Sequence, residues 1–237
     1  MTELIKIIPN KIISIHQPNY IPWLGYFYKI YQSDLFVFLD DVQYSNKAMH
    51  DFHYVKNPLG RFRLKVPVRA RFGDKIKDVI LNNNINWREN HLKQIEINYK
   101  KAPYYKEVYL DIAKVFEAND NELSTLNIRL IKLISEKFGF NTEFISSSEL
   151  IISGNDKNER IFNICRQLEA SVYYSGIGAA VYQNENDFKE RGIELRYSTF
   201  KPFIYPQFWR EFESNISILD YLMHCGYDWN LVLSKQP

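Results

Sequence analysis

Three features that would place a protein in a specialised class are scarce in this sequence: cysteine, long apolar runs and net charge. Two cysteines among 237 residues are too few for a disulfide scaffold, so a reducing compartment is expected. No stretch approaches the roughly 20 uncharged apolar residues of a transmembrane helix. The N-terminal segment carries Glu3 and lacks the apolar core of a signal peptide. We therefore expect a cytoplasmic protein without a membrane span.

A net charge of only +2 offers no electrostatic argument for a nucleic-acid partner. The sequence also contains no internal repeat, low-complexity segment or linker, and its nine glycines and nine prolines are scattered. Residues 1–237 are therefore predicted to form a single domain. Aromatic residues, by contrast, are abundant at 16%. They line a ligand-binding cleft or belong to a tyrosine-rich core, and the composition leaves both interpretations open.

The first forty residues predict a strand, a loop, a helix and a second strand. Ile12–His16 is a short apolar run typical of a buried strand. Two prolines exclude a helix over Gln17–Pro22. Apolar residues at helical spacing then favour a helix of about two turns over Trp23–Tyr31, and Leu35–Leu39 is a second buried strand. A strand, a helix and a strand in this order predict a parallel pair.

Further helices and strands alternate along the rest of the chain, as judged from hydrophobic periodicity and helix-capping residues. Helices are predicted over Trp87–Tyr99, from Pro103 to Phe116, over Glu122–Phe138, from Asp156 to Leu168, over Asn184–Arg191 and from Ser217 to Gly226. Strands are predicted over Thr142–Ser147, Ser171–Tyr174 and Ile193–Phe200. The predicted fold class is therefore α/β and Rossmann-like, with a mostly parallel sheet covered by helices.

Residues 61–69 alternate between apolar and basic side chains, which predicts a half-exposed strand in a small antiparallel edge piece. The basic face carries Arg61, Arg63, Lys65 and Arg69. Such a face can hold a phosphate or dock an acidic protein. It can equally be a solvated edge strand whose charges prevent aggregation. The sequence does not decide between these interpretations.

The strongest candidate site lies where the first predicted strand ends, since ligands of open α/β sheets bind outside the carboxyl ends of strands. His16 is there as an acid, a base or a ligand-orienting group, unless it is simply a satisfied, half-buried histidine. The helix that follows offers free N–H groups to an anion such as a diphosphate. The substrate-binding candidates of this segment are Gln17, Asn19, Tyr20, Trp23, Tyr26 and Lys29.

Acidic residues follow the second predicted strand. Asp40 and Asp41 would lie beside His16 if the two strands pair in parallel. A carboxylate at that position can hydrogen-bond a sugar hydroxyl, polarise the imidazole or hold a metal, whereas the alternative is an ordinary turn. We assign Asp40 and Asp41 as catalytic candidates, and Gln43 and Tyr44 as substrate-binding candidates.

A glycine turn, Ser175–Gly178, follows a later strand. Such a turn lets the backbone approach a phosphate or a pantetheine arm, although it is also typical of a plain tight turn. It lacks the third glycine of a dinucleotide fingerprint and the lysine of a P-loop. The substrate-binding candidates here are Ser175, Gly176, Gly178 and Tyr182. We expect His16, Asp40 and Ser175 to converge on one cleft.

No metal site and no enzyme nucleophile are predicted. His50 and His53 are close in sequence, but no third ligand is evident. Cys165 lies on the apolar stripe of its predicted helix and is expected in the core. Cys225 ends a helix, where the helix dipole disfavours a thiolate.

Two blocks near the N-terminus resemble the opening of the WbqC-like family. The first is HQPNYIPWLGYF from His16 to Phe27, and the second is DDVQY from Asp40 to Tyr44. The similarity continues at Val66–Val68, Ala102–Tyr105, Tyr174–Ala179, Tyr205–Gln207 and Ser217–Asp220. Members usually carry an Arg-Asn pair after the second block, where this chain reads HDFHY. The substrate is expected to differ if that pair contacts the ligand.

The resemblance implies a role in the biosynthesis of O-antigen or another surface polysaccharide, because the family is associated with such gene clusters. Members are often labelled as glycine or aminoacyl transferases. The implied reaction is N-acyl or aminoacyl transfer to a nucleotide-linked amino sugar. The implied co-substrate is a thioester of coenzyme A or of an acyl carrier protein, with no tightly bound cofactor. The resemblance also marks Tyr205 and Gln207 as substrate-binding.

Two other functions fit parts of the sequence. The opening strand, proline-rich loop and helix are similar to those of Rossmann-like nucleotidyltransferases. However, the paired histidines of the HxGH motif are replaced by Pro22–Gly25. A non-catalytic protein that binds sugar nucleotides also fits a cleft lined by aromatic residues.

Overall fold

The computed structural model describes residues 11–152, 156–209 and 211–237. These residues group into two compact units that alternate along the sequence. The sheet unit contains the chain up to His16, Lys29–Leu39 and Asn141–Thr199. The helical unit contains Gln17–Tyr28, Asp40–Phe140 and Phe200–Pro237. The single domain over residues 1–237 stays a prediction, because neither unit is a continuous stretch of chain.

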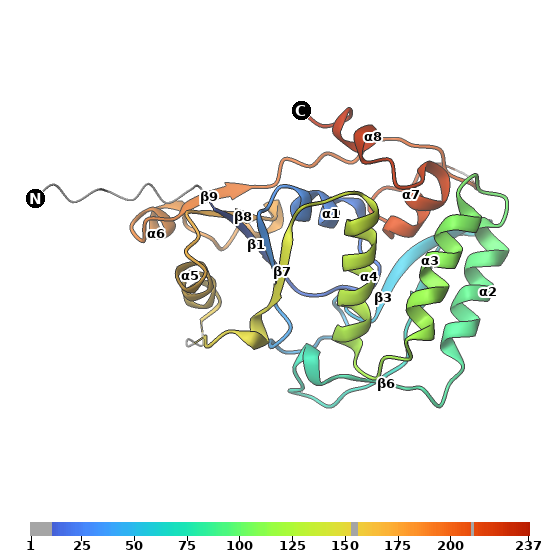
Figure 1. Cartoon of the computed structure of the whole chain (residues 1–237), viewed down its shortest axis with the longest axis horizontal. Coiled ribbons are helices and arrows are strands. Elements are labelled where there is room, and N and C mark those ends of the chain that lie inside the picture. The colour runs from blue at the N-terminus through green and yellow to red at the C-terminus, as the bar shows by residue number, and fades with distance from the viewer. Residues whose placement is uncertain (1–10, 153–155, 210) are drawn as a thin grey trace, which may run out of the picture. The chain divides into compact units, whose positions relative to one another are not determined.

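The sheet unit is built on a five-stranded sheet of the described residues, in the order β7-β2-β1-β8-β9 (Figure 1). The strands are β1 (Ile12–His16), β2 (Leu35–Phe38), β7 (Glu143–Ser146), β8 (Val172–Ser175) and β9 (Glu194–Tyr197). All neighbouring pairs in this sheet are parallel. The predicted α/β class with a mostly parallel sheet is thereby confirmed.

Two helices pack on one face of this sheet and form a hydrophobic core with it. They are α5 (Lys157–Gln167) and α6 (Glu185–Lys189). The core consists of Ile13, Ile15, Leu35, Val37, Tyr173, Ile193 and Leu195 with Phe162, Ile164, Cys165 and Phe188 from the helices. Successive side chains of a strand point to opposite faces, so the odd-numbered residues of β1 and β2 share this core. Cys165 is buried in the core, as predicted.

Three helices of the helical unit stand side by side (Figure 1): α2 (Trp87–Tyr99), α3 (Tyr105–Glu117) and α4 (Leu123–Lys137). The same unit contains α7 (Ile218–Cys225), α8 (Trp229–Leu233) and the start of α1 (Leu24–Tyr31). Ser217 caps α7, since its hydroxyl accepts a hydrogen bond from the Leu219 N–H (3.2 Å). No helix in the described part of the chain is both long and apolar enough to cross a bilayer.

The predicted strand over residues 61–69 is wrong, because the segment divides into two strands in different sheets. β4 (Gly60–Lys65) pairs antiparallel with β3 (Phe52–Asn57), and β5 (Val68–Arg69) pairs antiparallel with β6 (Ile80–Leu81). The break falls at Pro67, which has no N–H to donate to a ladder. The predicted small antiparallel piece is confirmed, and it consists of two two-stranded sheets.

Three histidines of the helical unit are buried as neutral imidazoles. Burial lowers the pKa of His50, His53 and His91 to about 4. His91 Nε2 lies 3.0 Å from the Lys65 carbonyl, which can only accept, so this nitrogen carries the proton. His91 Nδ1 then accepts from the Tyr20 hydroxyl (2.9 Å). The hydrogen bonds around His91 thus stabilise its neutral imidazole, and burial opposes the addition of a second proton.

These histidines predict that acid destabilises the protein. Their pKa in the unfolded chain is about 6.5, so the unfolded state takes up protons that the folded state excludes as pH falls from 6.5 to 4. Their stabilising contribution is complete above pH 6.5, and each loses up to about 1.4 kcal/mol per pH unit below it. Urea unfolding measured between pH 7.5 and 4.5 should show this decline, and His91→Gln should flatten it. A pH-independent free energy of unfolding would contradict the assignment.

Candidate functional site

The sheet unit has a topological switch point between β1 and β8. From β1 the chain continues to β2 and β7 on one side of the sheet, and then to β8 and β9 on the other. Numbered within the sheet, the order is 3-2-1-4-5, and doubly wound folds bind ligands outside the strand ends at such a reversal. β1 ends at His16 and β8 ends at Ser175. Two of the residues predicted from sequence therefore flank the switch point.

His16 is fixed by the backbone of the neighbouring strand. It pairs in register with Phe38, and its carbonyl accepts a hydrogen bond from the Leu39 N–H (2.8 Å). Its side chain is half-buried at the carboxyl end of β1. Histidine is the residue type whose ordinary pKa lies nearest to neutrality, and it is the commonest general base in enzymes.

Lys29 supports the end of β1 from inside the sheet unit. Its ammonium is buried and donates to the carbonyl of Ile15, the residue before His16 (2.8 Å). Burial lowers the pKa of Lys29 to about 7. Nearby, Ser33 donates to Ser14, which donates in turn to a carbonyl of β8. Lys29 thus holds the strand that carries His16, and its role as a direct substrate contact stays a prediction.

The turn after β8 provides open backbone at the switch point. The Ser175 hydroxyl donates to Gln183 Oε1 (2.9 Å), which closes the loop between them. A methyl group on Gly176 or Gly178 would meet no atom within 4 Å, and the φ of Gly176 is an ordinary −72°. Packing and backbone conformation therefore do not demand glycine here. Three apolar side chains are exposed on this loop: Ile177, Val181 and the predicted substrate contact Tyr182.

The loop after His16 belongs to the helical unit, where the fold holds it by its carbonyl groups. The carbonyls of Gln17, Pro18, Ile21 and Pro22 accept hydrogen bonds from Tyr26 Oη, Asn127 Nδ2, Ser217 Oγ and the Ile218 N–H, respectively. The Gln17 amide oxygen also lies 3.0 Å from His50 Nε2. Both ends of the proline-rich motif are thus fixed before any ligand is present.

Several predicted substrate contacts in this loop are buried within the helical unit. Tyr20, Tyr26 and Asn19 are almost inaccessible. Burial raises the pKa of the Tyr20 and Tyr26 hydroxyls, which are bonded to His91 and to the Gln17 carbonyl. Trp23 is half-buried and stacks on His53, with ring centroids 6.2 Å apart. These residues shape the loop, and their contact with substrate stays a prediction.

The acidic segment after β2 is also part of the helical unit. Asp40 is buried, and its carbonyl accepts from the Lys77 N–H (2.8 Å), while Gln43 forms an isolated bridge with Lys75. The Tyr44 ring lies 5.6 Å from that of His50 at a tilt of 45°, and both burial and the Asp51 carboxylate raise the pKa of Tyr44. Asp41 is half-buried. The convergence of His16, Asp40 and Ser175 on one cleft stays a prediction, since Asp40 belongs to a different unit from the other two.

The four predicted basic residues do not form one row. Arg61 and Arg63 of β4 lean over the rings of β3, with guanidinium carbons 4.9 Å from the Tyr54 centroid and 3.7 Å from the Phe52 centroid. Lys65 is paired with the buried Asp51 (3.4 Å). Arg69 lies on a separate strand and donates to Asn82 (3.0 Å). Of these four residues, Arg61 and Arg63 thus combine exposure with a guanidinium placed over an aromatic ring.

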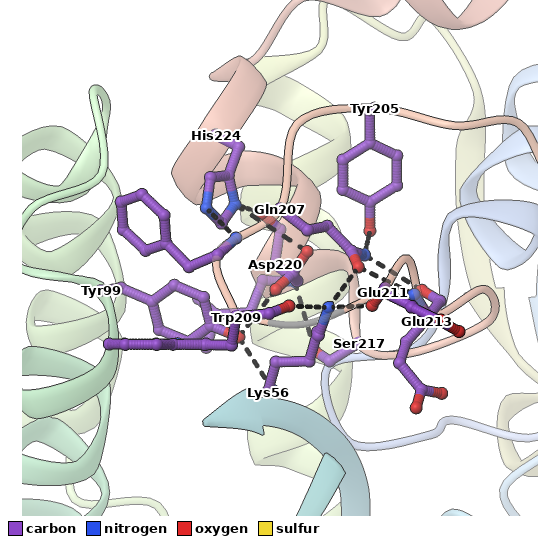
Figure 2. Close-up of polar contacts among 12 residues, drawn as sticks. Lys56, Tyr99, Tyr205, Gln207, Trp209, Glu211, Glu213, Ser217, Asp220 and His224 are labelled. Carbon is purple, nitrogen blue, oxygen red and sulfur yellow. Dashed lines mark hydrogen bonds and ion pairs between the residues drawn. The ribbon is translucent and has the colours of Figure 1, made fainter. Parts of the chain in front are cut away.

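Tyr205 and Gln207, implied as substrate contacts by the family resemblance, belong to a network around the buried Lys56 (Figure 2). Lys56 is only 1% exposed. Its ammonium donates to Gln207 Oε1 (3.0 Å) and to the carbonyls of Trp209 (2.8 Å) and Glu211 (2.6 Å). An ammonium has three protons, and three acceptors surround this one. Lys56 is therefore a structural cation and not a free nucleophile.

Asp220 and His224 complete this network within the helical unit (Figure 2). The Asp220 carboxylate is fully buried and accepts from the Tyr99 hydroxyl (2.9 Å), and burial raises its pKa. His224 Nε2 accepts from the Phe208 N–H (3.1 Å), so Nδ1 carries the proton toward the Asp220 carbonyl (2.8 Å). The loop before α7 is thus tied to β3 and to α7 by hydrogen bonds.

The network holds Trp209 in a strained conformation. Its φ of 61° lies in the left-handed region, which a bulky side chain rarely adopts. Such a conformation costs roughly 1–3 kcal/mol and persists only where the surroundings impose it. The bond from the Lys56 ammonium to the Trp209 carbonyl supplies that constraint.

Sequence reasoning missed the role of Lys56, because a lysine between Val55 and Asn57 resembles an exposed strand residue. In the residues that the structure describes, no group of three or more His, Cys, Asp or Glu is placed to hold a metal ion.

Comparison with known proteins shows similarity over both units. The model of the WbqC-like protein family matches residues 17–230. An uncharacterized protein of Mycobacterium tuberculosis, Rv1507c, is 33% identical over 220 residues, which cover 91% of this chain and 94% of the relative. No solved structure matches the chain. The resemblance carried by the two N-terminal blocks is thereby confirmed.

The space around each glycine predicts different effects of three substitutions on the free energy of unfolding. Gly176→Ala and Gly178→Ala should leave the free energy of unfolding within about 0.5 kcal/mol, because their added methyl groups meet nothing. Gly25→Ala should cost about 1–3 kcal/mol, since its methyl would lie 2.8 Å from the Phe200 ring. Urea unfolding of the three variants tests this. A large loss at Gly176 or Gly178 would mean that the turn itself requires glycine.

Proposed function

Because the chain belongs to the WbqC-like protein family, we propose that it transfers an acyl or aminoacyl group from a thioester to the amine of a nucleotide-linked amino sugar. The product would enter a surface polysaccharide such as O-antigen, and the reaction would take place in the cytoplasm. The observation that carries the proposal is the position of His16 and the open glycine turn on either side of the switch point of the sheet.

His16 acts as the general base in this proposal. The sugar amine attacks the thioester carbonyl, His16 takes the proton that the nitrogen loses, and the carbon–sulfur bond breaks. The protonated imidazole then returns the proton to the departing thiolate, so that His16 ends the cycle unchanged. Asp40 or Asp41 would orient the imidazole and stabilise its positive charge. The reaction needs no external oxidant or resident metal.

Direct attack by the amine, without an acyl-enzyme intermediate, agrees with the state of the two cysteines. Burial raises the pKa of Cys165 and Cys225 to about 12. Both therefore remain thiols at neutral pH, and a thiol is a far weaker nucleophile than a thiolate. Lys56 is excluded for a different reason, because three acceptors already surround its ammonium.

The loop after β8 suits the thioester donor. Coenzyme A and acyl carrier proteins both present the acyl group on a pantetheine arm, which is long, narrow and partly apolar. Open backbone at Gly176 and Gly178 allows such an arm to approach closely. The exposed side chains of Ile177, Val181 and Tyr182 offer apolar contacts along it.

Arg61 and Arg63 are the proposed docking point for an acidic carrier protein. Each guanidinium is fixed against an aromatic ring and exposed at its edge. Pre-positioned guanidinium groups bind carboxylates and phosphates with little loss of side-chain entropy. Lys65 and Arg69 are left out of this docking point because each already has a partner.

The assignment of the base predicts a selective loss of turnover. His16→Asn should lower kcat by roughly 10²-fold or more while leaving the KM for the amino sugar nearly unchanged, because the substituted side chain cannot accept the proton. Gly176→Ala should instead raise the KM for the thioester. Steady-state kinetics with coenzyme A thioesters and nucleotide-linked amino sugars measure both. Unchanged turnover in His16→Asn removes His16 as the base, and pyrophosphate release from a nucleoside triphosphate would favour nucleotidyl transfer.

Carrier docking predicts a difference between two donors. Arg61→Glu with Arg63→Glu should raise the KM for a carrier-bound donor, most strongly at low salt, because steering by charge weakens with ionic strength. The same variant should leave kcat with a small thioester mimic nearly intact. Arg69→Glu with Arg71→Glu makes the same change in charge at the end of β5 and just after it, and should have little effect. An equal loss of activity with both donors would place the two arginines at the sugar nucleotide. Unchanged kinetics would mean that the two charges only protect the β3–β4 hairpin from aggregation.

A further inference from the structure

A pocket in the helical unit contains none of the residues assigned to the proposed reaction. It lies between the end of α2 and the loop before α7, and it is lined by Ile97, Asn98, Lys100, Lys101, Phe208 and Trp209. Each of these residues belongs to the same compact unit. The pocket combines a flat aromatic surface with positive charge.

Two large apolar side chains of the pocket are exposed to solvent. Ile97 is 55% exposed and Trp209 is 36% exposed. The Phe208 ring lies beside the indole, with centroids 6.0 Å apart and planes at 67°. An exposed indole that lines a hollow is a surface on which a planar ring can stack.

The position of the indole is imposed by the fold. Trp209 has a φ of 61°, and its carbonyl is held by the buried ammonium of Lys56 (2.8 Å). The residue before it is held as well, since the Phe208 N–H donates to His224 (3.1 Å). A strained residue kept in place by a buried network and presented to solvent is typical of a ligand-binding position.

Lys100 and Lys101 provide the charge of the pocket. Both are exposed, and among the described residues neither has a carboxylate partner. No aspartate or glutamate lines the pocket. Two exposed ammonium groups that form no ion pair attract an anion, and phosphate is a common biological anion that lysines bind.

Asn98 adds a hydrogen-bonding group to the wall of the pocket. It is 5% exposed, and its Nδ2 donates to the Gln94 carbonyl of the same helix (2.8 Å). The hydrogen bonds of the described residues include none to its carbonyl oxygen, so this oxygen can accept from a ring N–H or an exocyclic amine.

We propose that this pocket binds a nucleotide. The base stacks on the Trp209 indole, an N–H of the base donates to the Asn98 carbonyl oxygen, and the phosphates lie against Lys100 and Lys101. The same base and phosphate chemistry occurs in a nucleoside diphosphate and in coenzyme A. The proposal does not depend on acyl transfer, and it would hold for a protein that only binds nucleotides.

The test is equilibrium binding to the full chain, measured by calorimetry and by tryptophan fluorescence. Fluorescence reports the contact because stacking on an exposed indole quenches its emission. The probes are UDP, ADP, coenzyme A, adenosine and inorganic pyrophosphate. We expect at least one of UDP, ADP and coenzyme A to bind about tenfold or more tightly than adenosine or pyrophosphate alone, because base and phosphate act together. The probe that binds most tightly of these three shows whether the natural ligand is a nucleoside diphosphate or coenzyme A. Failure of all three to bind at millimolar concentration, or equal binding of pyrophosphate, would overturn the proposal.

Two variants locate the binding in this pocket. Trp209→Asn removes the indole and places at this position a residue that tolerates positive φ, so it should fold at least as well as the parent and bind roughly tenfold more weakly. Lys100→Gln with Lys101→Gln should weaken binding to a similar extent and reduce its dependence on salt. Lys93→Gln with Lys114→Gln makes the same change in charge on α2 and α3 outside the pocket and should bind normally. Parental affinity in Trp209→Asn, with a native unfolding transition, would exclude this pocket as the site.

Discussion

Parallel pairing on both edges of β1 is the constraint from which the arrangement of the sheet unit follows. Ile13 pairs with Leu35 of β2 and with Tyr173 of β8, so this strand lies inside the sheet. A strand in that position must be apolar, and any polar group beside it must find a partner within the fold. The Lys29 ammonium does so by donating to the carbonyl before His16. The strand can present a reactive side chain only where its pairing ends, and His16 stands at that point.

A buried positive charge plays the corresponding part in the helical unit. The protons of the Lys56 ammonium each require an acceptor, and two of the acceptors are carbonyl groups of the loop before α7. The loop therefore follows the geometry of the ammonium even where this puts Trp209 in an unfavourable backbone conformation. Tyr205 and Gln207, which the family resemblance marks as substrate-binding, belong to this hydrogen-bond network in the structure. Their contact with substrate stays a prediction.

Local signals made the sheet and most helices predictable, whereas the contacts across the chain were not. Apolar runs indicated β1 and β2, and the carboxylate of Asp156 indicated the start of α5. β3 was missed because His53 and Lys56 occupy buried positions where an apolar residue is expected. The acceptors of the Lys56 ammonium lie 151 to 155 residues later in the chain, and no local sequence pattern predicts hydrogen bonds over such a distance. For the same reason the sequence could not show that Asp40 belongs to a different unit from His16 and Ser175, and the convergence of the three residues stays a prediction.

The alternation of the two units along the chain has a consequence for folding during synthesis. β1 leaves the ribosome well before its partner β8, which follows 160 residues later in the chain. At typical rates of translation this delay is roughly 10–30 s. Throughout that interval one edge of an apolar strand has no native partner, and an unpaired strand edge is a template for aggregation. Pairing of β1 with β8 therefore cannot be completed until the later part of the chain has been synthesised.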